Sequence, residues 1–221
     1  VAKPGQTTAF IGSTGSGKST LINLIPRYYD VTKGSVKVDG VDVRDMTQKE
    51  LRDKLGYVPQ KGVLFSGTID SNIRYGKPEI TDAQVKEAAE VAQATEFIDT
   101  KPEKYESPVS QGGTNVSGGQ KQRLSIARAI AKDPEIFIFD DSFSALDFKT
   151  DSQLRKALKE YTKDATTVIV AQRISTILGA DQIIVLDDGH MAGIGTHKEL
   201  MANCEVYQQI ARSQLSEEEL A

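Results

Sequence analysis

Eight residues near the start of the chain combine glycines with a lysine and several hydroxyl groups. Their order matches the pattern in which backbone N–H groups curl around phosphates at a helix N-terminus. In that pattern Lys18 would bind the β and γ phosphates, and the Ser19 hydroxyl would bind Mg²⁺. The alternative is an ordinary glycine-rich turn, but an apolar strand before it and a helix after it favour a nucleotide site. The predicted nucleotide contacts are Gly12, Ser13, Thr14, Gly15, Ser16, Gly17, Lys18, Ser19 and Thr20.

Two carboxylates follow the apolar run at residues 136–139. A carboxylate at a strand tip is typical of the second half of a phosphate-loop site, where it holds the metal through its water shell. Asp140 is therefore predicted to take part in binding Mg²⁺. The alternative is an aspartate that only caps a helix or a turn.

The nine residues 115–123, Asn-Val-Ser-Gly-Gly-Gln-Lys-Gln-Arg, resemble the signature motif of ABC transporter ATPases. The resemblance extends over essentially the whole chain. Gln60, after Tyr-Val-Pro, resembles the Q-loop of the family, and residues 144–147 resemble its D-loop. Residues 65–69 and 195–200 are similar to exporter members in particular.

The resemblance implies that Gln60 completes the metal shell and senses the γ-phosphate. It also implies that the signature surface meets ATP held by a second domain of the same kind, so that two ATPs join two domains. Independently of the family, a helix start attracts anions, although Ser117 could also be a simple N-cap. The signature residues predicted to contact nucleotide are Ser117, Gly118, Gly119 and Gln120. The segment from Phe65 to Tyr75 is expected to contact coupling helices of a transmembrane domain.

Two positions depart from the family pattern. Asp141 stands where the family has a glutamate that positions the attacking water, and Gln172 stands where it has a switch histidine. A glutamine donates hydrogen bonds but cannot shuttle a proton. Asp141, Gln172 and Gln60 are the predicted catalytic positions, and this chain's own site is expected to bind ATP and hydrolyse it slowly.

This combination resembles the degenerate-site subunit of heterodimeric bacterial ABC exporters of the multidrug or lipid type. The signature would then complete the competent site of the partner subunit. Two alternatives stay open. One is a homodimeric exporter domain with slow hydrolysis through Asp141. The other is a non-transport ABC ATPase, or a module that uses ATP only to hold a dimer together.

The elements expected to position these residues alternate between strands and helices. Strands are predicted at residues 7–11, 34–40, 55–58, 136–139, 167–171 and 183–186, and helices at 19–25, 82–94, 95–99 and 117–131. This order predicts an α/β fold with a mainly parallel sheet. Its expected form is a P-loop NTPase core, a small antiparallel β patch and a helical lobe at residues 82–131. Residues 103–116 are predicted as loop, and 216–221 as a frayed end.

The size and composition fit a single domain, residues 1–221, with 38% hydrophobic residues. A net charge of −4 provides no global positive field for nucleic acid. The one cysteine, Cys204, cannot form an internal disulfide. No apolar run approaches the ~20 residues of a membrane-spanning helix. The expectation is a domain excised from a longer subunit with an upstream membrane domain, located at the cytoplasmic face of the cell membrane.

Overall fold

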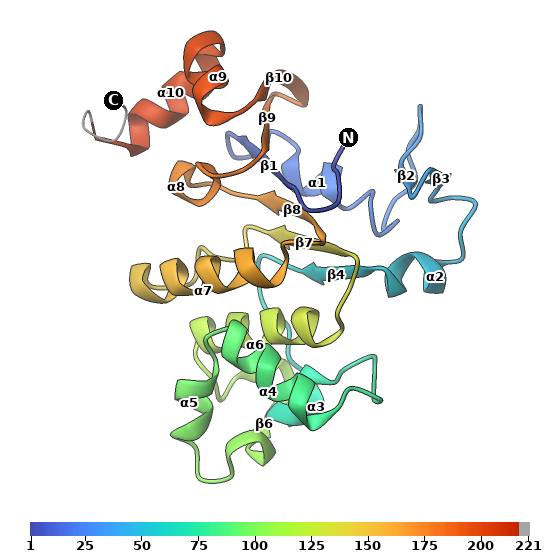
Figure 1. Ribbon diagram of the computed structural model, residues 1–221, viewed down its shortest axis with the longest axis vertical. Coiled ribbons are helices and arrows are strands. Elements are labelled where there is room, and N and C mark those ends of the chain that lie inside the picture. The colour runs from blue at the N-terminus through green and yellow to red at the C-terminus, as the bar shows by residue number, and fades with distance from the viewer. Residues whose placement is uncertain (217–221) are drawn as a thin grey trace.

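The computed structural model describes residues 1–216, in which six strands form one sheet (Figure 1). The strands lie in the order β10-β9-β1-β8-β7-β4. β10 runs antiparallel to β9, and every other neighbouring pair is parallel. The predicted α/β fold with a mainly parallel sheet is confirmed. The bounds are β1 (Thr7–Gly12), β4 (Leu55–Val58), β7 (Ile136–Asp140), β8 (Thr166–Val170), β9 (Gln182–Asp187) and β10 (His190–Gly195).

The register of the parallel strands determines where the site forms. Val58 of β4 pairs with Phe139 of β7, and Asp140 pairs with Val170 of β8. The three strands therefore end at the same edge of the sheet, where ligands bind in folds of this kind. The residues that follow these strands along the chain meet at that edge.

Several helices begin where the sequence supplies a side chain that caps them. Five of them carry reciprocal capping boxes, in which the N-cap hydroxyl and the third helical side chain bond to each other's backbone N–H. Their N-caps are Thr47, Thr68, Thr81, Ser117 and Thr196. The bounds are α1 (Lys18–Ile22), α2 (Gln48–Asp53), α3 (Ile69–Ile73), α4 (Asp82–Val91), α5 (Thr95–Asp99), α6 (Gly118–Ala131), α7 (Phe148–Tyr161), α8 (Ile174–Ile177), α9 (His197–Asn203) and α10 (Glu205–Gln214).

Helices α3 to α6 form a lobe beside the β4 edge of the sheet (Figure 1). One buried cluster includes Val85 of α4, Leu124 of α6, Leu154 of α7 and Phe137 of β7. The apolar core of the lobe is thus continuous with the core under this side of the sheet. A second cluster lies between β1, β9 and helices α8 to α10. The lobe and the sheet are held together by shared apolar burial.

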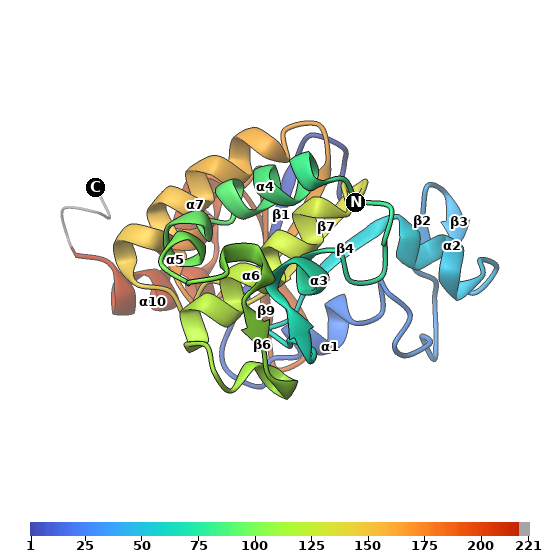
Figure 2. The same cartoon turned by 90° about the horizontal axis from the view of Figure 1, so that it is seen from below.

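Two short antiparallel pairs accompany the main sheet. β2 (Lys37–Val38) pairs with β3 (Val41–Asp42) across Asp39 and Gly40, whose φ angles of 51° and 80° suit a two-residue hairpin turn. This hairpin is the predicted antiparallel patch, although the paired part is shorter than residues 34–40. Figure 2 shows the hairpin and α2 at the opposite end of the molecule from α5 and α10.

Three predicted extents were wrong. The helix predicted at 82–94 ends at Val91, because Ala92 is its C-cap. Helix α1 ends at Ile22 rather than at residue 25, because the N–H groups of Leu24 and Ile25 bond to carbonyls three residues back as the chain approaches Pro26. Residues 103–116 are not only loop. They contain two 3₁₀ turns and the strand β6 (Pro108–Val109), which pairs with β5 (Gly67–Thr68). Of the end predicted to fray, residues 217–221 lie outside the described residues.

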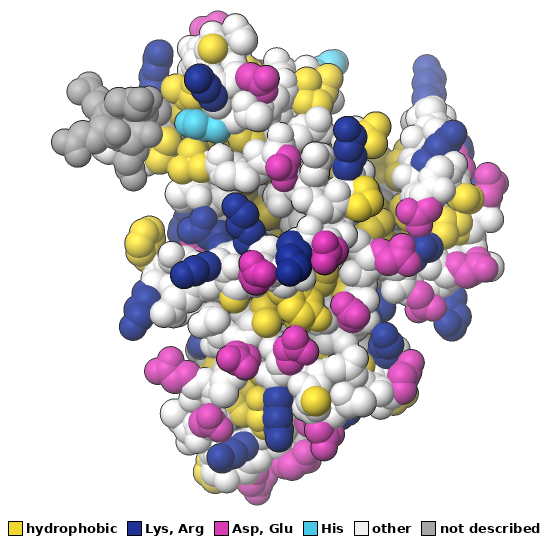
Figure 3. Space-filling model, in the orientation of Figure 1, with side chains coloured by type: hydrophobic (Ala, Val, Ile, Leu, Met, Phe, Trp, Pro, Cys, Tyr) yellow, Lys and Arg dark blue, Asp and Glu magenta, His cyan; other side chains and the backbone are white. Residues whose placement is uncertain are grey.

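No helix among residues 1–216 has the length and apolar character needed to cross a membrane. On the face shown in Figure 3, Lys and Arg side chains alternate with Asp and Glu, and neither sign dominates. This mixture agrees with the net charge of −4.

Candidate functional site

The glycine-rich loop between β1 and α1 has a shape that only glycine permits at several positions. A Cβ atom at Gly12 would lie 2.1 Å from the carbonyl oxygen of Leu186, which is well inside any real contact. Gly15 and Gly17 have φ angles of 84° and 95°, the left-handed region that side chains disfavour. The close approach and the reversed backbone together give a tight cradle.

Lys18 is buried and curls back over this loop. Its Nζ atom donates to the carbonyl oxygens of Gly12 and Ser13, each at 2.8 Å, and to Oγ of Ser16 at 3.3 Å. Burial lowers the pKa of Lys18, and the charges of Asp141 and Asp140 oppose that shift. Helix α1 starts without a side-chain cap and without an acidic residue in its first turn. Its first N–H groups are therefore available to phosphate oxygens.

Ser19 and Asp140 meet, as the metal prediction requires. The Ser19 hydroxyl donates a 2.8 Å hydrogen bond to Oδ1 of Asp140, and the two residues are 121 positions apart in the sequence. A hydroxyl and a carboxylate are hard oxygen donors of the kind that Mg²⁺ takes when phosphates and water supply the rest of its shell. The two side chains thus fit a magnesium ion. Asp140 ends β7 and accepts a hydrogen bond from Ser19, so it does not act as a helix cap.

The three predicted catalytic residues are in direct contact. Oδ2 of Asp141 accepts hydrogen bonds from Nε2 of Gln60 at 3.0 Å and from Nε2 of Gln172 at 2.7 Å. They follow β4, β7 and β8, whose ends are neighbours. The Gln60 amide is directed at Asp141, so its role as a metal ligand stays a prediction.

Asp141 lies in an enclosed place with an unusual backbone. It is 8% exposed, and its φ angle of 47° is left-handed. Burial raises the pKa of Asp141, although hydrogen bonds from Gln60 and Ser144 pull it down. A cavity of about 230 Å³ adjoins Asp141 and Gln172 and is also lined by Asp151 and Arg173.

The signature segment starts α6 in the helical lobe, apart from α1 (Figure 1). Oγ of Ser117 accepts from the Gln120 N–H at 3.2 Å, and Oε1 of Gln120 accepts from the Ser117 N–H at 3.1 Å. Ser117 is therefore an N-cap, as its simpler interpretation had it. A Cβ atom at Gly118 would meet nothing within 4 Å, so packing inside the chain does not explain this glycine. At Gly119 the nearest atom would be the Ala145 carbonyl oxygen at 3.5 Å.

The segment expected to contact a membrane domain forms an aromatic stack. Phe65 lies on Tyr75 with ring centroids 4.1 Å apart, and the Arg128 guanidinium lies 5.3 and 5.4 Å from the two centroids. Burial lowers the pKa of Arg128 to about 10. Tyr75 is 55% exposed, whereas Ile69 is fully buried and belongs to the core.

One polar contact of Asp140 is marked by no motif. The Tyr57 hydroxyl lies within hydrogen-bond reach of the Asp140 carboxylate. Tyr57 belongs to β4, three residues before Gln60, whereas Asp140 ends β7. The available signal is indirect: Tyr57 stands in the segment 55–58, which is predicted as a strand. Only the register of β4 against β7 brings the two together.

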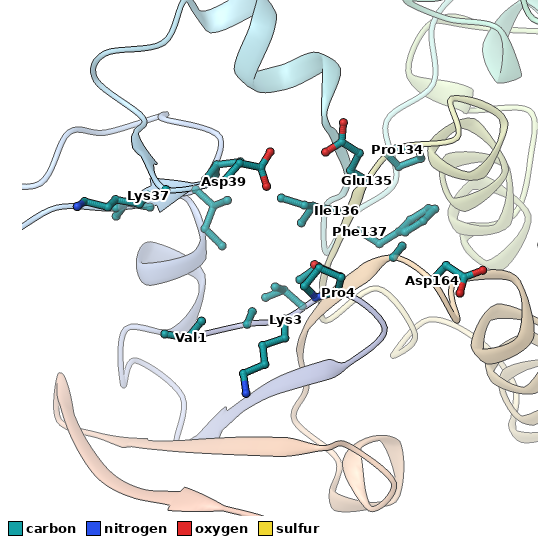
Figure 4. Close-up of a pocket in the computed structure, with 18 of the residues that line it drawn as sticks. Val1, Lys3, Pro4, Lys37, Asp39, Pro134, Glu135, Ile136, Phe137 and Asp164 are labelled. Atoms are coloured by element: carbon teal, nitrogen blue, oxygen red, sulfur yellow. The ribbon is translucent and has the colours of Figure 1, made fainter.

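The widest space near the chain start is not the site. A cavity of about 1170 Å³ lies between residues 1–4, the β2–β3 hairpin and the beginning of β7 (Figure 4). Figure 4 shows Val1, Lys3 and Pro4 on one side, with Lys37 and Asp39 across from them. No predicted site residue lines this cavity. Cavity size alone would point away from the phosphate loop, and the converging polar groups locate the site more reliably.

A phosphate loop beside a strand-tip carboxylate, at the edge of a parallel sheet, defines a P-loop ATPase domain. Residues 2–144 match the ABC transporter family profile. The chain belongs to the ABC transporter family, and it is an ATP-binding ATPase domain of that family.

Three similar proteins illustrate this membership. An uncharacterized ABC transporter ATP-binding protein of Mycobacterium bovis is 50% identical over 96% of this chain and 37% of its own length. A protein of Staphylococcus aureus, named as a candidate multidrug export ATP-binding/permease protein, is 48% identical over 93% of this chain and 36% of its own length. The solved structure of a bacterial Atm1-family ABC exporter with ATP bound has a TM-score of 0.93 at 38% identity, covering 98% of this chain and 38% of that one. The chain thus spans little more than a third of these relatives.

Proposed function

We propose that this chain is the ATP-binding domain of an ABC exporter and that it works as one half of a dimer closed around two ATPs. Its own phosphate-loop site binds ATP and hydrolyses it slowly, while its signature completes the site of a partner domain. The observation that carries the proposal is the Asp141 carboxylate, held by the amides of Gln60 and Gln172 beside an intact phosphate loop.

Nucleotide binding would use the cradle around Lys18. The lysine would exchange its loop carbonyls for the β and γ phosphates, with phosphate oxygens taking the first N–H groups of α1. Ser19 and Asp140 would hold Mg²⁺, with Gln60 completing the shell and sensing the γ-phosphate. When bound, the ion neutralises negative charge that develops on the phosphates.

Slow turnover follows from the side chains around Asp141. Its carboxylate is one methylene shorter than that of a glutamate, and two amides hold the same oxygen. Gln172 can donate a hydrogen bond to the γ-phosphate but cannot accept and pass on a proton. Because a well-placed acid–base group contributes about 10²–10⁴-fold to the rate, the loss at this site should be large.

The open space at Gly118 of the signature supports the proposal of a partner domain. A glycine with open space above it, at a capped helix start, leaves room for an external group to approach the backbone. The group of matching chemistry is the γ-phosphate of ATP held by a second ABC domain. A different, competent partner subunit is favoured, because this chain keeps its signature while two of its own hydrolytic positions are altered.

Coupling to membrane helices would involve the stack of Phe65, Tyr75 and Arg128. The exposed ring of Tyr75 stacks on the half-buried ring of Phe65 beside a partly buried cation, and this arrangement suits contact with a short helix. The similar proteins named for export or as an exporter support outward transport and a membrane part. We propose that this membrane domain lies upstream and that this chain lies at the cytoplasmic face of the membrane. Nucleic acid is not a proposed partner, because the charges are mixed.

A homodimer that hydrolyses slowly through Asp141 is the second candidate. It is favoured by one observation: Asp141 still presents a carboxylate at the edge that holds Lys18 and Asp140. A non-transport ABC ATPase, or a dimer held together by unhydrolysed ATP, would share this site. Turnover in the assembled complex separates the dimer held together by unhydrolysed ATP from an exporter domain that hydrolyses ATP.

The deciding experiment measures ATP turnover of the chain before and after introducing Asp141→Glu and Gln172→His together. A rise of about 10²-fold or more is expected if these positions silence the site. The matched control places the same two exchanges at exposed positions, Asp187→Glu with Gln209→His, and should leave turnover unchanged. Equal turnover in wild type and the double variant would favour the homodimer instead.

A further inference from the structure

Tyr57 joins three segments of the phosphate-binding edge. Its hydroxyl has a single hydrogen and two acceptors within reach, Oδ1 of Asn23 at 3.0 Å and Oδ2 of Asp140 at 3.4 Å. Asn23 is the C-cap of α1, the helix that starts at the phosphate loop, and Asp140 ends β7. One hydroxyl on β4 therefore connects the far end of the phosphate-loop helix to the strand-tip carboxylate.

The two oxygens of Asp140 have different partners. Oδ1 accepts a hydrogen bond from the Ser19 hydroxyl at 2.8 Å, and Oδ2 lies 3.4 Å from the Tyr57 hydroxyl, which it shares as an acceptor with Asn23. Oδ1 is thus on the side of the other proposed magnesium ligand, and Oδ2 is turned toward β4. A carboxylate held at one oxygen cannot rotate freely, so the remaining oxygen keeps its direction.

The aromatic ring of Tyr57 is itself fixed. It packs edge-on against Tyr28, with centroids 5.6 Å apart and an interplanar angle of 82°, and the Arg52 guanidinium lies 5.4 Å from the Tyr28 centroid. The backbone of Tyr57 pairs with Ile138, two residues before Asp140. Packing and strand register therefore determine the place of the hydroxyl before any ligand binds.

We propose that Tyr57 is a positioning residue that holds the Asp140 carboxylate so that Oδ1 faces Mg²⁺. This inference rests on the magnesium site proposed above. Outer-shell partners of ligating carboxylates commonly change metal affinity by about 10–100-fold when removed. The simpler view is that Tyr57 only fills the core, and in that case phenylalanine would serve equally well.

The test compares Tyr57→Phe with Tyr28→Phe. Both changes remove one hydroxyl from the same ring pair, but the structure gives no hydrogen bond to the Tyr28 hydroxyl among residues 1–216. Mn²⁺ binding in the presence of ATP is followed by electron paramagnetic resonance, and ATP affinity is measured separately in EDTA. Circular dichroism verifies that each variant is folded.

Tyr57→Phe should bind Mn²⁺ about ten-fold more weakly, with its ATP affinity in EDTA unchanged. Tyr28→Phe should match wild type in both measurements. Unchanged Mn²⁺ affinity in Tyr57→Phe, an equal loss in Tyr28→Phe, or a parallel loss of ATP affinity in EDTA would overturn the inference. If wild type with ATP binds no Mn²⁺, the magnesium site itself fails, which is a different outcome.

Asn23→Ala supplies a second test that keeps Tyr57 intact. Without the Asn23 acceptor, the single hydrogen of the Tyr57 hydroxyl can be donated only to Asp140. Mn²⁺ affinity should then be kept or rise. A ten-fold loss in Asn23→Ala would mean that the link to α1, and not the contact with Asp140, matters, and the inference would be rejected.

Discussion

The side-chain amide of Gln172 donates a 2.7 Å hydrogen bond to Oδ2 of Asp141. The two residues occupy the positions at which this chain departs from its family, and they contact each other directly. A change at one therefore alters the surroundings of the other, because residues that share a hydrogen bond are energetically coupled.

This contact predicts non-additive effects of the two substitutions. Asp141→Glu alone should raise ATP turnover only slightly, since Gln172 and Gln60 can still hold the carboxylate. Gln172→His alone should also do little, because the shorter carboxylate stays. Their combination should exceed the product of the single effects when kcat is measured for all four proteins. Effects that simply multiply would show that Gln172 does not act on Asp141.

Lys18→Met is predicted to weaken ATP binding at least ten-fold, about 1.4 kcal/mol. The methionine keeps much of the volume but cannot donate to phosphate oxygens. Binding of a fluorescent ATP analogue measures the loss, and Lys33→Met at an exposed position is the control. An unchanged affinity would mean that Lys18 contributes nothing to nucleotide binding at the glycine-rich loop.

Gly118→Ala should separate folding from dimer formation. A methyl group at this position meets nothing within 4 Å, so the thermal midpoint should be unchanged or slightly raised. If a phosphate of a partner's ATP approaches here, ATP-dependent association with that partner should fall. Light scattering with and without ATP measures this association. Normal association would argue against a ligand at Gly118.

Tyr207 predicts a loss of stability in alkali. Burial raises its pKa from 10.0 to about 12. Because the folded pKa lies above the unfolded value, the contribution of neutral Tyr207 to stability is complete below pH 10 and disappears as pH rises toward 12. Tyr207→Phe should unfold more easily than wild type at neutral pH, having lost the 2.7 Å hydrogen bond to His197. The gap should narrow or reverse near pH 11.

Urea unfolding at both pH values tests this expectation, with Tyr29→Phe at an exposed position as the control. A gap that stays constant with pH would show that Tyr207 ionises equally in the folded and unfolded chain.

Motifs with strong local constraints were predictable from the sequence. Gly12 and Gly17 mark a loop that other residues cannot form, and the apolar run before Asp140 marks a buried strand that ends in a carboxylate. The general architecture followed from the alternation of such runs with helical patterns. The sequence therefore predicted that Ser19 and Asp140 belong to the same site.

Features that depend on long-range pairing could not be predicted. The β5–β6 pair joins Gly67 to Val109 through only two positions on each strand, too short for a periodic signal. His197 is half-buried because α10 brings the Tyr207 hydroxyl against it, and no local pattern around His197 indicates that contact. The contact of Tyr57 with Asp140 could not be predicted, because it depends on strand register, which single-sequence patterns do not define.

Helix α6 carries the signature at its first turn and Arg128, under the Phe65–Tyr75 stack, near its last. Fourteen residues at 1.5 Å each make a rod of about 20 Å. Under the proposed function, a nucleotide contacts one end of this rod and the membrane part contacts the other. A tilt of about 10° would displace the far end by about 3.5 Å. The helix is thus a lever arm, which converts a small angular change at the phosphate into a linear stroke.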